Sequence, residues 1–408
     1  MRRTTLGSDE GIQATATDAA EGKLSAASLG YFHDPFVSFF VQGRTQGGPG
    51  GRGERALPRR SPPVINRAGN FARVSCVEKL VLEFLTPQPG RSDATASLAG
   101  DGASSGMTGH HRGDGKLPQV LSLGAGKDTL FFRLKEKDTA PPGGYVEVDF
   151  ETVAMWKARM VAKTPVLARL ASLGGHEEQS TASGQPLPRA TQAGAHPGKG
   201  DGGSGGQGLY HLVAADLRDT RVVESALRRV GVDFSAPTIV LAECVLVYME
   251  PRESSALLEW CAASFPDSMF VAYEMTRPDD AFGRVMRQNI QRMGCLLPGL
   301  EAFPSLEAQQ ERFVSAGWDA CGAVDMLSIF ENFLDPAEVR RASRIEFLDE
   351  VEEWELIMRH YCLVVAAKGK DAEMRLSSLP LSPAPLACGK ETQREGLRER
   401  AAAASELS

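Results

Sequence analysis

Apolar and polar positions follow one another along the chain in blocks that predict strands separated by helices. Seven short, mostly apolar runs have the length and composition of buried strands. They cover residues 120–123, 145–149, 210–215, 238–242, 268–273, 323–326 and 361–366. Residues 150–170 and the segment opened by Pro251 carry apolar positions at helical spacing instead. Strands that alternate with helices predict an α/β fold with a doubly wound, mostly parallel sheet.

The first predicted strand runs directly into a glycine turn. In Leu123-Gly124-Ala125-Gly126 the glycines let the backbone turn sharply and approach a ligand closely. The third small residue of a dinucleotide fingerprint is missing, which disfavours a nicotinamide-dependent dehydrogenase, and no phosphate-binding G-x-x-x-x-G-K-[ST] motif occurs. The pattern favours a nucleoside without a pyrophosphate, such as S-adenosylmethionine. A G-x-G sequence is also typical of a plain strand-to-helix turn, and that alternative stays open here.

Carboxylates follow three further predicted strands. Asp149 comes 23 residues after Gly126, and Asp216 and Glu243 end the next two strands. In open α/β sheets ligands bind outside the carboxyl ends of the strands, where a carboxylate holds ribose hydroxyls. Each acidic residue alone is explained equally well as a helix cap. Four strand ends that carry glycine or a carboxylate at one edge together predict a ligand site.

The composition is uneven and suggests domain boundaries. The 42 glycines and 24 prolines of the 408 residues are concentrated in segments with little apolar content, which cannot bury enough surface to offset chain entropy. We predict one domain over residues 23–369, with a disordered N-terminus over 1–22 and a disordered tail over 370–408. Glycine-rich insertions are predicted at about 43–62, 86–116 and 172–208.

Charge and cysteine usage exclude several classes of protein. The net charge of −7 disfavours nucleic acid and membrane surfaces as partners. No run approaches the roughly 18 apolar residues of a membrane span, and the N-terminus lacks an apolar signal core. The seven cysteines form no C-x-x-C pair, so neither a disulfide framework nor a metal site is predicted. The predicted compartment is the cytoplasm.

A series of short blocks occurs in a fixed order along the chain. They lie at residues 30–35, 63–67, 71–74, 123–126, 147–150, 216–219, 242–249, 273–274, 282–286, 305–307, 317–318, 346–350 and 358–362. In this order the blocks resemble the leucine carboxyl methyltransferase family, whose members use S-adenosylmethionine to methylate the C-terminal leucine carboxylate of the protein phosphatase 2A catalytic subunit. The resemblance implies a monomeric class I S-adenosylmethionine-dependent methyltransferase with a Rossmann-like sheet and helical cap insertions. Two features depart from the family pattern: residues 66–71 carry one extra residue and lack the usual aromatic residue before Phe71, and the glycine-rich insertions are foreign to the compact members of the family.

The resemblance also implies a set of site residues. The implied cofactor-binding residues are Lys23 and Arg73 at the methionine carboxylate, Gly124 and Gly126 beneath the methionine part, Asp149 at the ribose, Asp216 and Leu217 at the adenine, and Glu243 beside the methyl-transfer point. Arg73 is also implied at the reacting carboxylate, and Tyr248 lines the same point, so these two are the candidate catalytic residues. Without the resemblance, Arg73 would be interpreted as a surface salt bridge and Tyr248 as a packed aromatic residue.

The chemistry of carboxyl methylation agrees with these residues. An α-carboxyl group has a pKa of about 3.3–3.7 and is already ionised at cellular pH, so no general base is required. The enzyme has to strip water from the carboxylate and align it, and Arg73 can hold it by a charge-assisted hydrogen bond.

Two alternatives to this function stay open from the sequence. One is a related methyltransferase that acts on a modified tRNA base or a small carboxylic acid; the tRNA-acting relatives carry an added repeat domain, which we do not expect here. The other is a non-catalytic protein that binds the phosphatase tail.

Overall fold

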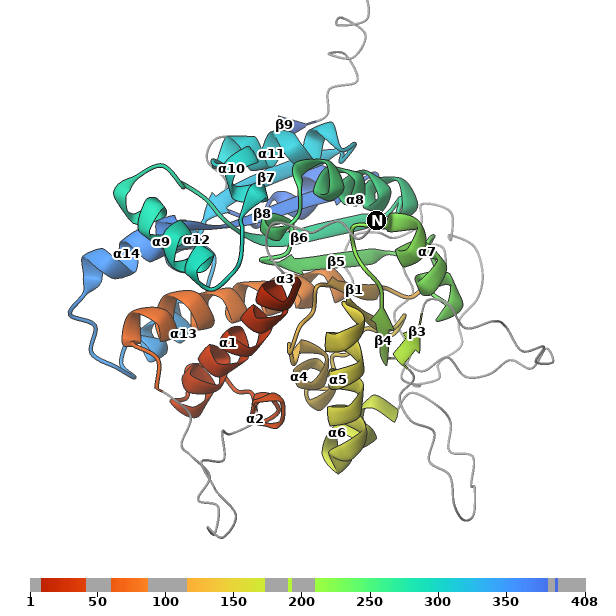
Figure 1. Ribbon diagram of the computed structural model, residues 1–408, viewed down its shortest axis with the longest axis horizontal. Helices are drawn as coiled ribbons and strands as arrows, with labels where there is room; N and C mark the ends of the chain where they lie inside the picture. The colour runs from red at the N-terminus through yellow and green to blue at the C-terminus, as the bar shows by residue number, and fades with distance from the viewer. Residues whose placement is uncertain are drawn as a thin grey trace, which may run out of the picture.

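A nine-stranded sheet forms the centre of the molecule in the computed structural model (Figure 1). The structure describes residues 9–41, 60–86, 116–172, 190–192, 210–380 and 386–387. The strands are β1 (Gln119–Leu123), β2 (Tyr145–Asp149), β3 (Ala190–Gln192), β4 (Tyr210–Ala214), β5 (Thr238–Glu243), β6 (Ser268–Met275), β7 (Ala320–Asp325), β8 (Tyr361–Lys368) and β9 (Leu386–Ala387). Their order is β3-β4-β2-β1-β5-β6-β8-β7-β9, and the strands from β3 to β6 are parallel. Only pairs that involve β8 or β9 are antiparallel, so the predicted doubly wound, mostly parallel sheet is confirmed.

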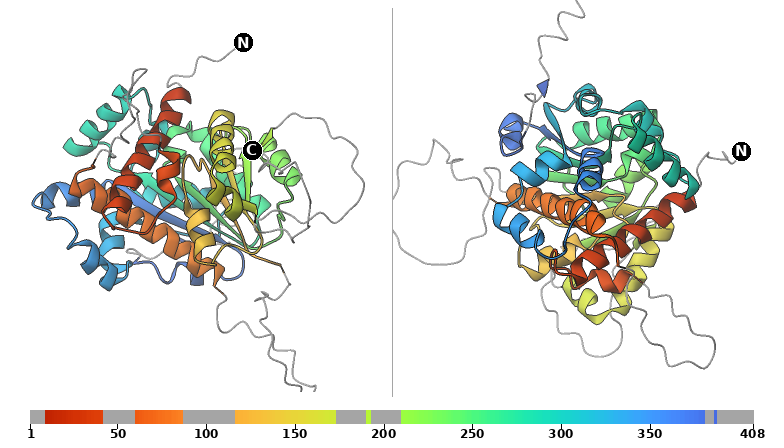
Figure 2. Two further views of the ribbon diagram at one scale, coloured as in Figure 1. Left: turned by 90° about the horizontal axis from the view of Figure 1, so that it is seen from below. Right: turned by 90° about the vertical axis from the view of Figure 1, so that its left-hand side faces the viewer.

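Helices cover both faces of the sheet (Figures 1 and 2). One face carries α7 (Thr220–Arg229), α8 (Pro251–Ser264) and α11 (Leu306–Ser315). The other carries α3 (Arg73–Leu85), α4 (Leu130–Glu136), α5 (Glu151–Lys163), α6 (Pro165–Ser172), α12 (Met326–Asn332) and α14 (Val351–Arg359). The remaining elements are α1 (Asp9–Ser28), α2 (Val37–Phe40), η1 (Ile65–Ala72), η2 (Leu246–Tyr248), α9 (Ala281–Arg292), α10 (Pro298–Ala302), α13 (Pro336–Ala342) and α15 (Ala372–Leu376). Across these described segments, no helix has the length and apolar character that a bilayer span requires.

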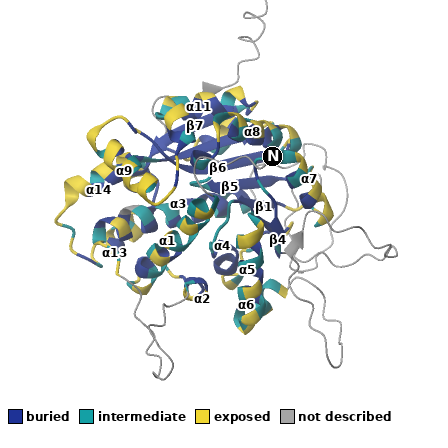
Figure 3. Cartoon of the chain, viewed as in Figure 1, coloured by how far each residue is buried: buried dark blue, intermediate teal, exposed yellow. Residues whose placement is uncertain are grey.

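The central strands supply two hydrophobic cores at once. Along β6, Met269, Val271 and Tyr273 enter the core under one helical layer, while Phe270 and Ala272 enter the core under the other. Every residue of β6 is buried, because both faces are covered, and this explains the unbroken apolar run in the sequence. Figure 3 shows the strands as buried and the outer sides of the helices as exposed.

The N-terminal region differs from the sequence prediction. Disorder is predicted over residues 1–22, but residues 9–22 belong to the 20-residue helix α1, so the prediction is wrong for them. Alanine and glycine dominate α1, which therefore has no apolar stripe that a pattern search detects. The helix is instead held by the close approach of its glycines to other segments: a Cβ atom on Gly11 would lie 2.9 Å from the backbone oxygen of Gly294, and one on Gly22 would lie 3.1 Å from Asn70 Nδ2 of η1.

The predicted tail and insertions also contain ordered pieces. The disorder predicted over residues 370–408 is wrong for α15, which packs on β7 and β8 with Leu376 buried, and for β9, which pairs with β7. The insertions predicted at 43–62, 86–116 and 172–208 lie largely outside the described residues. Within the last of them, β3 adds to the edge of the sheet beside β4. Backbone hydrogen bonds suffice for an edge strand, so no apolar run announces it.

One predicted helix is in fact two. Residues 150–170 divide into α5 and α6, with Thr164 between them in an extended conformation at φ −106° and ψ 105°. The following Pro165 disfavours helical angles at the residue before it, which explains the break.

Candidate active site

The carboxyl ends of the parallel strands open into a cavity of about 660 Å³. The strand register places Leu123 beside Val148 and Ala242, and Glu243 beside Tyr273, so these ends lie level with one another. All the site residues predicted from the sequence line this cavity: Lys23, Arg73, Gly124, Gly126, Asp149, Asp216, Leu217, Glu243 and Tyr248. The structure thus brings the whole predicted set together, while the role of each residue stays a prediction.

The glycine turn is shaped by contacts that exclude any side chain. Gly124 and Gly126 have φ values of +60° and +54°. A Cβ atom on Gly124 would lie 2.6 Å from Val245 Cγ2, and one on Gly126 would lie 3.1 Å from the Cβ of Ala16 on α1. The turn therefore allows both α1 and the segment after β5 to approach β1 closely.

Asp149 is braced by backbone amides and keeps acceptor capacity toward the cavity. Its Oδ2 accepts a hydrogen bond from Gly126 N at 2.7 Å, and its Oδ1 accepts one from Phe150 N at 2.7 Å. Burial raises the pKa of Asp149, although both amides act in the opposite direction. Since each carboxylate oxygen has two lone pairs, both can accept one further hydrogen bond from a ligand diol.

Asp216 is joined to the start of α1 through Arg218. The guanidinium donates from Nη2 to Asp216 Oδ2 at 2.6 Å, and from Nη1 and Nη2 to the two carboxylate oxygens of Asp9 at 3.1 Å each. Hydrogen bonds to Asp216 raise the pKa of Arg218 above its ordinary value, against the effect of burial. Arg218 thus ties α1 across the cavity to the end of β4.

We expect Asp9→Ala to loosen the start of α1. The ion pair is half exposed and such pairs contribute up to about 1 kcal/mol, so amide exchange in the first turns of α1 should rise by about threefold, most clearly at low salt. Hydrogen exchange read by mass spectrometry measures this. Glu338→Ala is the control, because it removes an exposed pair with Arg341 of 2.8 Å that does not contact α1's first turn. Unchanged exchange at α1 in Asp9→Ala would contradict the assignment.

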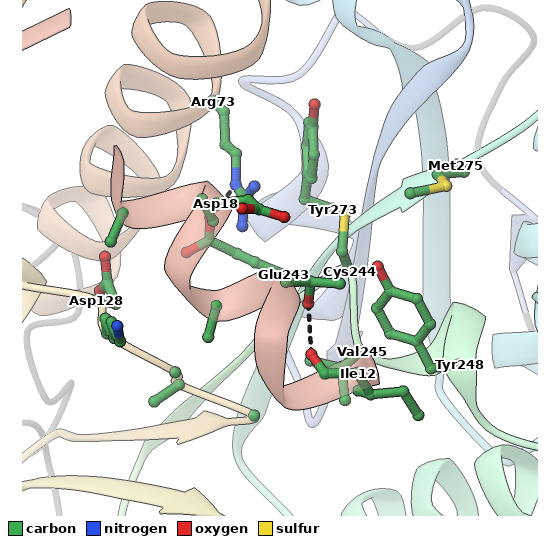
Figure 4. A pocket seen from close by; sticks show the side chains of 18 of the residues that line it. Ile12, Asp18, Arg73, Asp128, Glu243, Cys244, Val245, Tyr248, Tyr273 and Met275 are labelled. Atoms are coloured by element: carbon green, nitrogen blue, oxygen red, sulfur yellow. Dashed lines mark hydrogen bonds and ion pairs between the residues drawn. The ribbon is translucent and has the colours of Figure 1, made fainter. Parts of the chain in front are cut away.

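Arg73 is a fixed cation on the opposite side of the cavity. Its Nε donates to Glu243 Oε2, and its guanidinium carbon lies 4.7 Å from the centroid of the Tyr273 ring. Burial opposes the charge of Arg73, but the Glu243 carboxylate outweighs it and raises the arginine pKa above its ordinary value. Tyr273 in turn stacks on Tyr361 with centroids 5.3 Å apart. Figure 4 shows Arg73 and Tyr273 on one side of the pocket, with α1 carrying Ile12 and Asp18 across it.

A π-helix immediately precedes Arg73. It is η1, and its wide turn contains one more residue than an α-helical turn. Asn70 donates to Ile65 O at 3.3 Å within it, and Asn66 donates to the buried carboxylate of Glu346 at 3.0 Å. The segment 66–71, one residue longer than the family pattern, lies within this helix, and Arg73 directly after it lines the cavity.

Lys23 and Tyr248 complete the predicted set. Lys23 Nζ donates to Asp128 Oδ1 at 2.6 Å, and both side chains are largely buried. Burial opposes ionisation of Asp128, yet Lys23, helped by Arg133 and Lys157, holds the pKa of that carboxyl well below its usual range. Burial also raises the pKa of Tyr248 far above its ordinary value, so its phenol keeps its proton.

Several lining residues escape the sequence reasoning. Lys127 donates a hydrogen bond to Thr17 of α1 at 2.9 Å, and its ammonium group lies 4.4 Å from the centroid of the Trp156 ring. Cys244, directly after Glu243, has a strained φ of +54°. Lys127 and Cys244 directly follow the predicted site residues Gly126 and Glu243, so the sequence could have indicated that they line the cavity. The lining residues in the first half of α1 have no such neighbour in the sequence. Among the residues that the structure describes, no group of three or more His, Cys, Asp or Glu side chains is arranged to hold a metal ion.

The sheet and its cavity have the arrangement of a class I methyltransferase, with a glycine turn after β1 and carboxylates after the next strands. A family model described as leucine carboxyl methyltransferase matches residues 109–262. Bovine leucine carboxyl methyltransferase 1 is 35% identical over 361 residues, which cover 88% of this chain and 91% of the bovine protein. The Arabidopsis thaliana homolog is 33% identical over 355 residues, 87% of this chain and 88% of that protein. The chain belongs to the leucine carboxyl methyltransferase family and is a methyltransferase.

A further relative has a different printed name. Human tRNA wybutosine-synthesizing protein 4 is 37% identical over 358 residues, which cover 88% of this chain but 44% of the human protein. This chain therefore spans less than half the length of that relative.

Proposed function

We propose that this protein binds S-adenosylmethionine in the cavity and methylates the C-terminal leucine carboxylate of the protein phosphatase 2A catalytic subunit, in the cytoplasm. One observation carries the proposal: Arg73 provides a fixed cation at the end of β5, in the cavity that the neutral phenol of Tyr248 also lines. An anionic oxygen nucleophile needs a cation to orient it and no base to activate it. Membership of the family supports the leucine carboxylate as the target.

The cavity fits the cofactor in size and in chemistry. About 660 Å³ is within the usual range of roughly 300–1,000 Å³ for small-molecule sites. The free lone pairs of Asp149 suit the ribose hydroxyls, Asp216 and Leu217 suit the adenine, and Lys23 suits the methionine carboxylate. The bare backbone of Gly124 and Gly126 leaves room beneath the methionine part. When bound, S-adenosylmethionine supplies an electrophilic methyl group on a positively charged sulfur.

The residues of the chain then have distinct tasks. Glu243 and the face of Tyr273 hold the Arg73 guanidinium in one orientation, so that it can donate a charge-assisted hydrogen bond to the substrate carboxylate. Tyr248 remains protonated and lines the same point. Apolar side chains of α9, among them Phe282, line the outer wall and exclude water from the carboxylate. The same wall suits the side chain of a leucine.

A tRNA substrate is the second candidate, because a relative with 37% identity is named for tRNA wybutosine synthesis. The net charge of −7 weighs against it, since RNA-binding surfaces are basic.

Transfer of a labelled methyl group tests the proposal. We expect label on the intact phosphatase 2A catalytic subunit, loss of that label in mild alkali as for a methyl ester, and no label on a subunit that lacks its last leucine. Calorimetry with S-adenosylmethionine measures cofactor binding in parallel. Cofactor binding without label on the subunit would refute the substrate, and the same assay with tRNA and small carboxylic acids would then identify the alternative.

A further inference from the structure

A buried carboxylate that plays no part in the site described above faces the backbone of the active-site segment 244–248. Glu274 follows Tyr273 on β6 and is 1% exposed. Its Oε1 accepts a hydrogen bond from Leu246 N at 3.1 Å, and the N–H groups of Val245 and Val247 also bond to this carboxylate. One side chain thus faces three consecutive backbone amides of a segment whose first residue, Cys244, is strained.

The segment that Glu274 holds carries much of the cavity wall. Cys244, Val245 and Tyr248 all line the cavity, and Val245 packs against the position where Gly124 has no side chain. A shift of these residues would therefore change the shape of the cavity at the proposed methyl-transfer point. It would also move the glycine turn that we propose lies beneath the cofactor. Backbone conformations of this strained kind persist only where surrounding contacts enforce them.

Arg312 of α11 is the cation that faces Glu274. It is 5% exposed, its guanidinium carbon lies 4.1 Å from the centroid of the Phe303 ring, and its Nε and Nη2 have no hydrogen-bond partner. The guanidinium donates from Nη1 to Gln309 Oε1 at 3.4 Å and acts on Glu274 through its charge. Glu274 is the acid whose charge it feels.

We propose that Glu274 is a positioning residue for methyl transfer: its ionised carboxylate holds the amides of residues 245–247 in place, and Arg312 provides the opposing charge. When the carboxyl is protonated, one oxygen becomes a donor that faces N–H groups, and the segment is released. The activity part of this inference rests on the proposed function.

The ionisation of Glu274 falls in an accessible pH range. Burial raises its pKa to about 7, although Arg312 and the three amides act in the opposite direction. The other titratable groups facing it do not change charge there: burial raises the pKa of Cys244 to about 12 and that of Cys362 on β8 well above its ordinary value, and Arg312 has a pKa lowered to about 10. The amides lower the pKa of this carboxyl, so a Glu274 that stays buried but loses them has a higher pKa than in the ordered segment. Protonation therefore favours release, and the segment becomes loosened as the pH falls through 7 and ordered as it rises above 7.

Hydrogen exchange on the full chain tests this positioning role without any substrate. Protection factors of the 245–247 amides, corrected for intrinsic rates, should rise by about tenfold from pH 6 to pH 8, since one unit of pKa corresponds to one decade in the equilibrium. Glu274→Gln should remove this rise. Arg312→Met should move it to higher pH, because the carboxylate loses its opposing charge. Glu147→Gln is the matched control: burial raises the pKa of Glu147 to about 7 as well, but this carboxyl binds Lys157 on the other side of β1, so the rise should persist.

The kcat of methyl transfer over the same pH range is the second readout. It should rise through pH 7 in the wild type and lose this step in Glu274→Gln, with KM for S-adenosylmethionine changed less than kcat. A pH-dependent rise in protection that survives in Glu274→Gln, or stays in place in Arg312→Met, would overturn the inference. If the phosphatase subunit is not a substrate, the wild type shows no turnover while the exchange results still decide the role of Glu274.

Discussion

Arg73→Ala should lose essentially all methyl transfer, with kcat reduced by about a thousandfold and S-adenosylmethionine affinity within a few fold of the wild type. The reason is the place of the guanidinium, which Glu243 and the Tyr273 ring hold at the end of β5. In the proposed function the nucleoside part of the cofactor is held elsewhere, by Asp149 and Asp216, so we expect its binding to be largely kept. Steady-state kinetics with the phosphatase subunit and calorimetry with the cofactor separate the two quantities. Normal turnover in this variant would eliminate the role of Arg73.

A loss of folding has to be distinguished from this loss of chemistry. Removing Arg73 leaves the Glu243 carboxylate without its partner, and breaking a buried pair costs about 3–5 kcal/mol. The double variant Arg73→Ala with Glu243→Gln removes the unpaired charge and should recover most of the stability to thermal unfolding, but no turnover. Recovery of turnover in the double variant would show that the single substitution acts through stability alone.

Gly124→Ala should weaken S-adenosylmethionine binding by more than about tenfold, which corresponds to more than about 1.4 kcal/mol. The new Cβ atom would lie 2.6 Å from Val245 Cγ2, so the turn or the segment 244–248 has to move. The backbone strain at φ +60° adds about 1–2 kcal/mol of instability. Val245→Ala in the same chain should restore part of the affinity, because it removes the contacted methyl groups. Calorimetry measures both effects.

Gly317→Ala is the matched control for this prediction. Its φ of +91° imposes comparable strain, but no heavy atom lies within 4 Å of the added Cβ atom, and it lies between α11 and β7 away from the cavity. It should lower the unfolding temperature and leave cofactor affinity unchanged. Equal loss of affinity in both glycine variants would mean that strain, and not the contact with Val245, accounts for the effect.

Much of the fold could be predicted because its signals are local. The strand β6 appears in the sequence as an apolar run, since both of its faces are covered by helices. The break between α5 and α6 was missed, although Pro165 indicates it. The helix α1 could not have been found in this way, because its many small residues leave no apolar stripe.

The residues of the candidate site likewise differ in whether a local sequence signal predicts them. Asp149, Asp216 and Glu243 could be grouped from the sequence, because the carboxyl ends of parallel strands share one edge of a sheet. Arg73 and Lys23 came from the family resemblance, and neither their partners nor the role of Glu274 could be predicted.

The sequence by itself determined the seven longer strands, the doubly wound sheet and the edge at which we expect a ligand to bind. These depend on hydrophobic periodicity and on the chain direction of successive strands, which are properties of neighbouring residues. Only the tertiary structure decided that α1 crosses the cavity, that Arg73 pairs with Glu243 and that Glu274 holds the segment after β5. Arg73 and Glu243 are 170 residues apart in the chain, and Lys23 and Asp128 are 105 apart. Pairings of this kind are set by packing in three dimensions, so no local pattern in the sequence contains them.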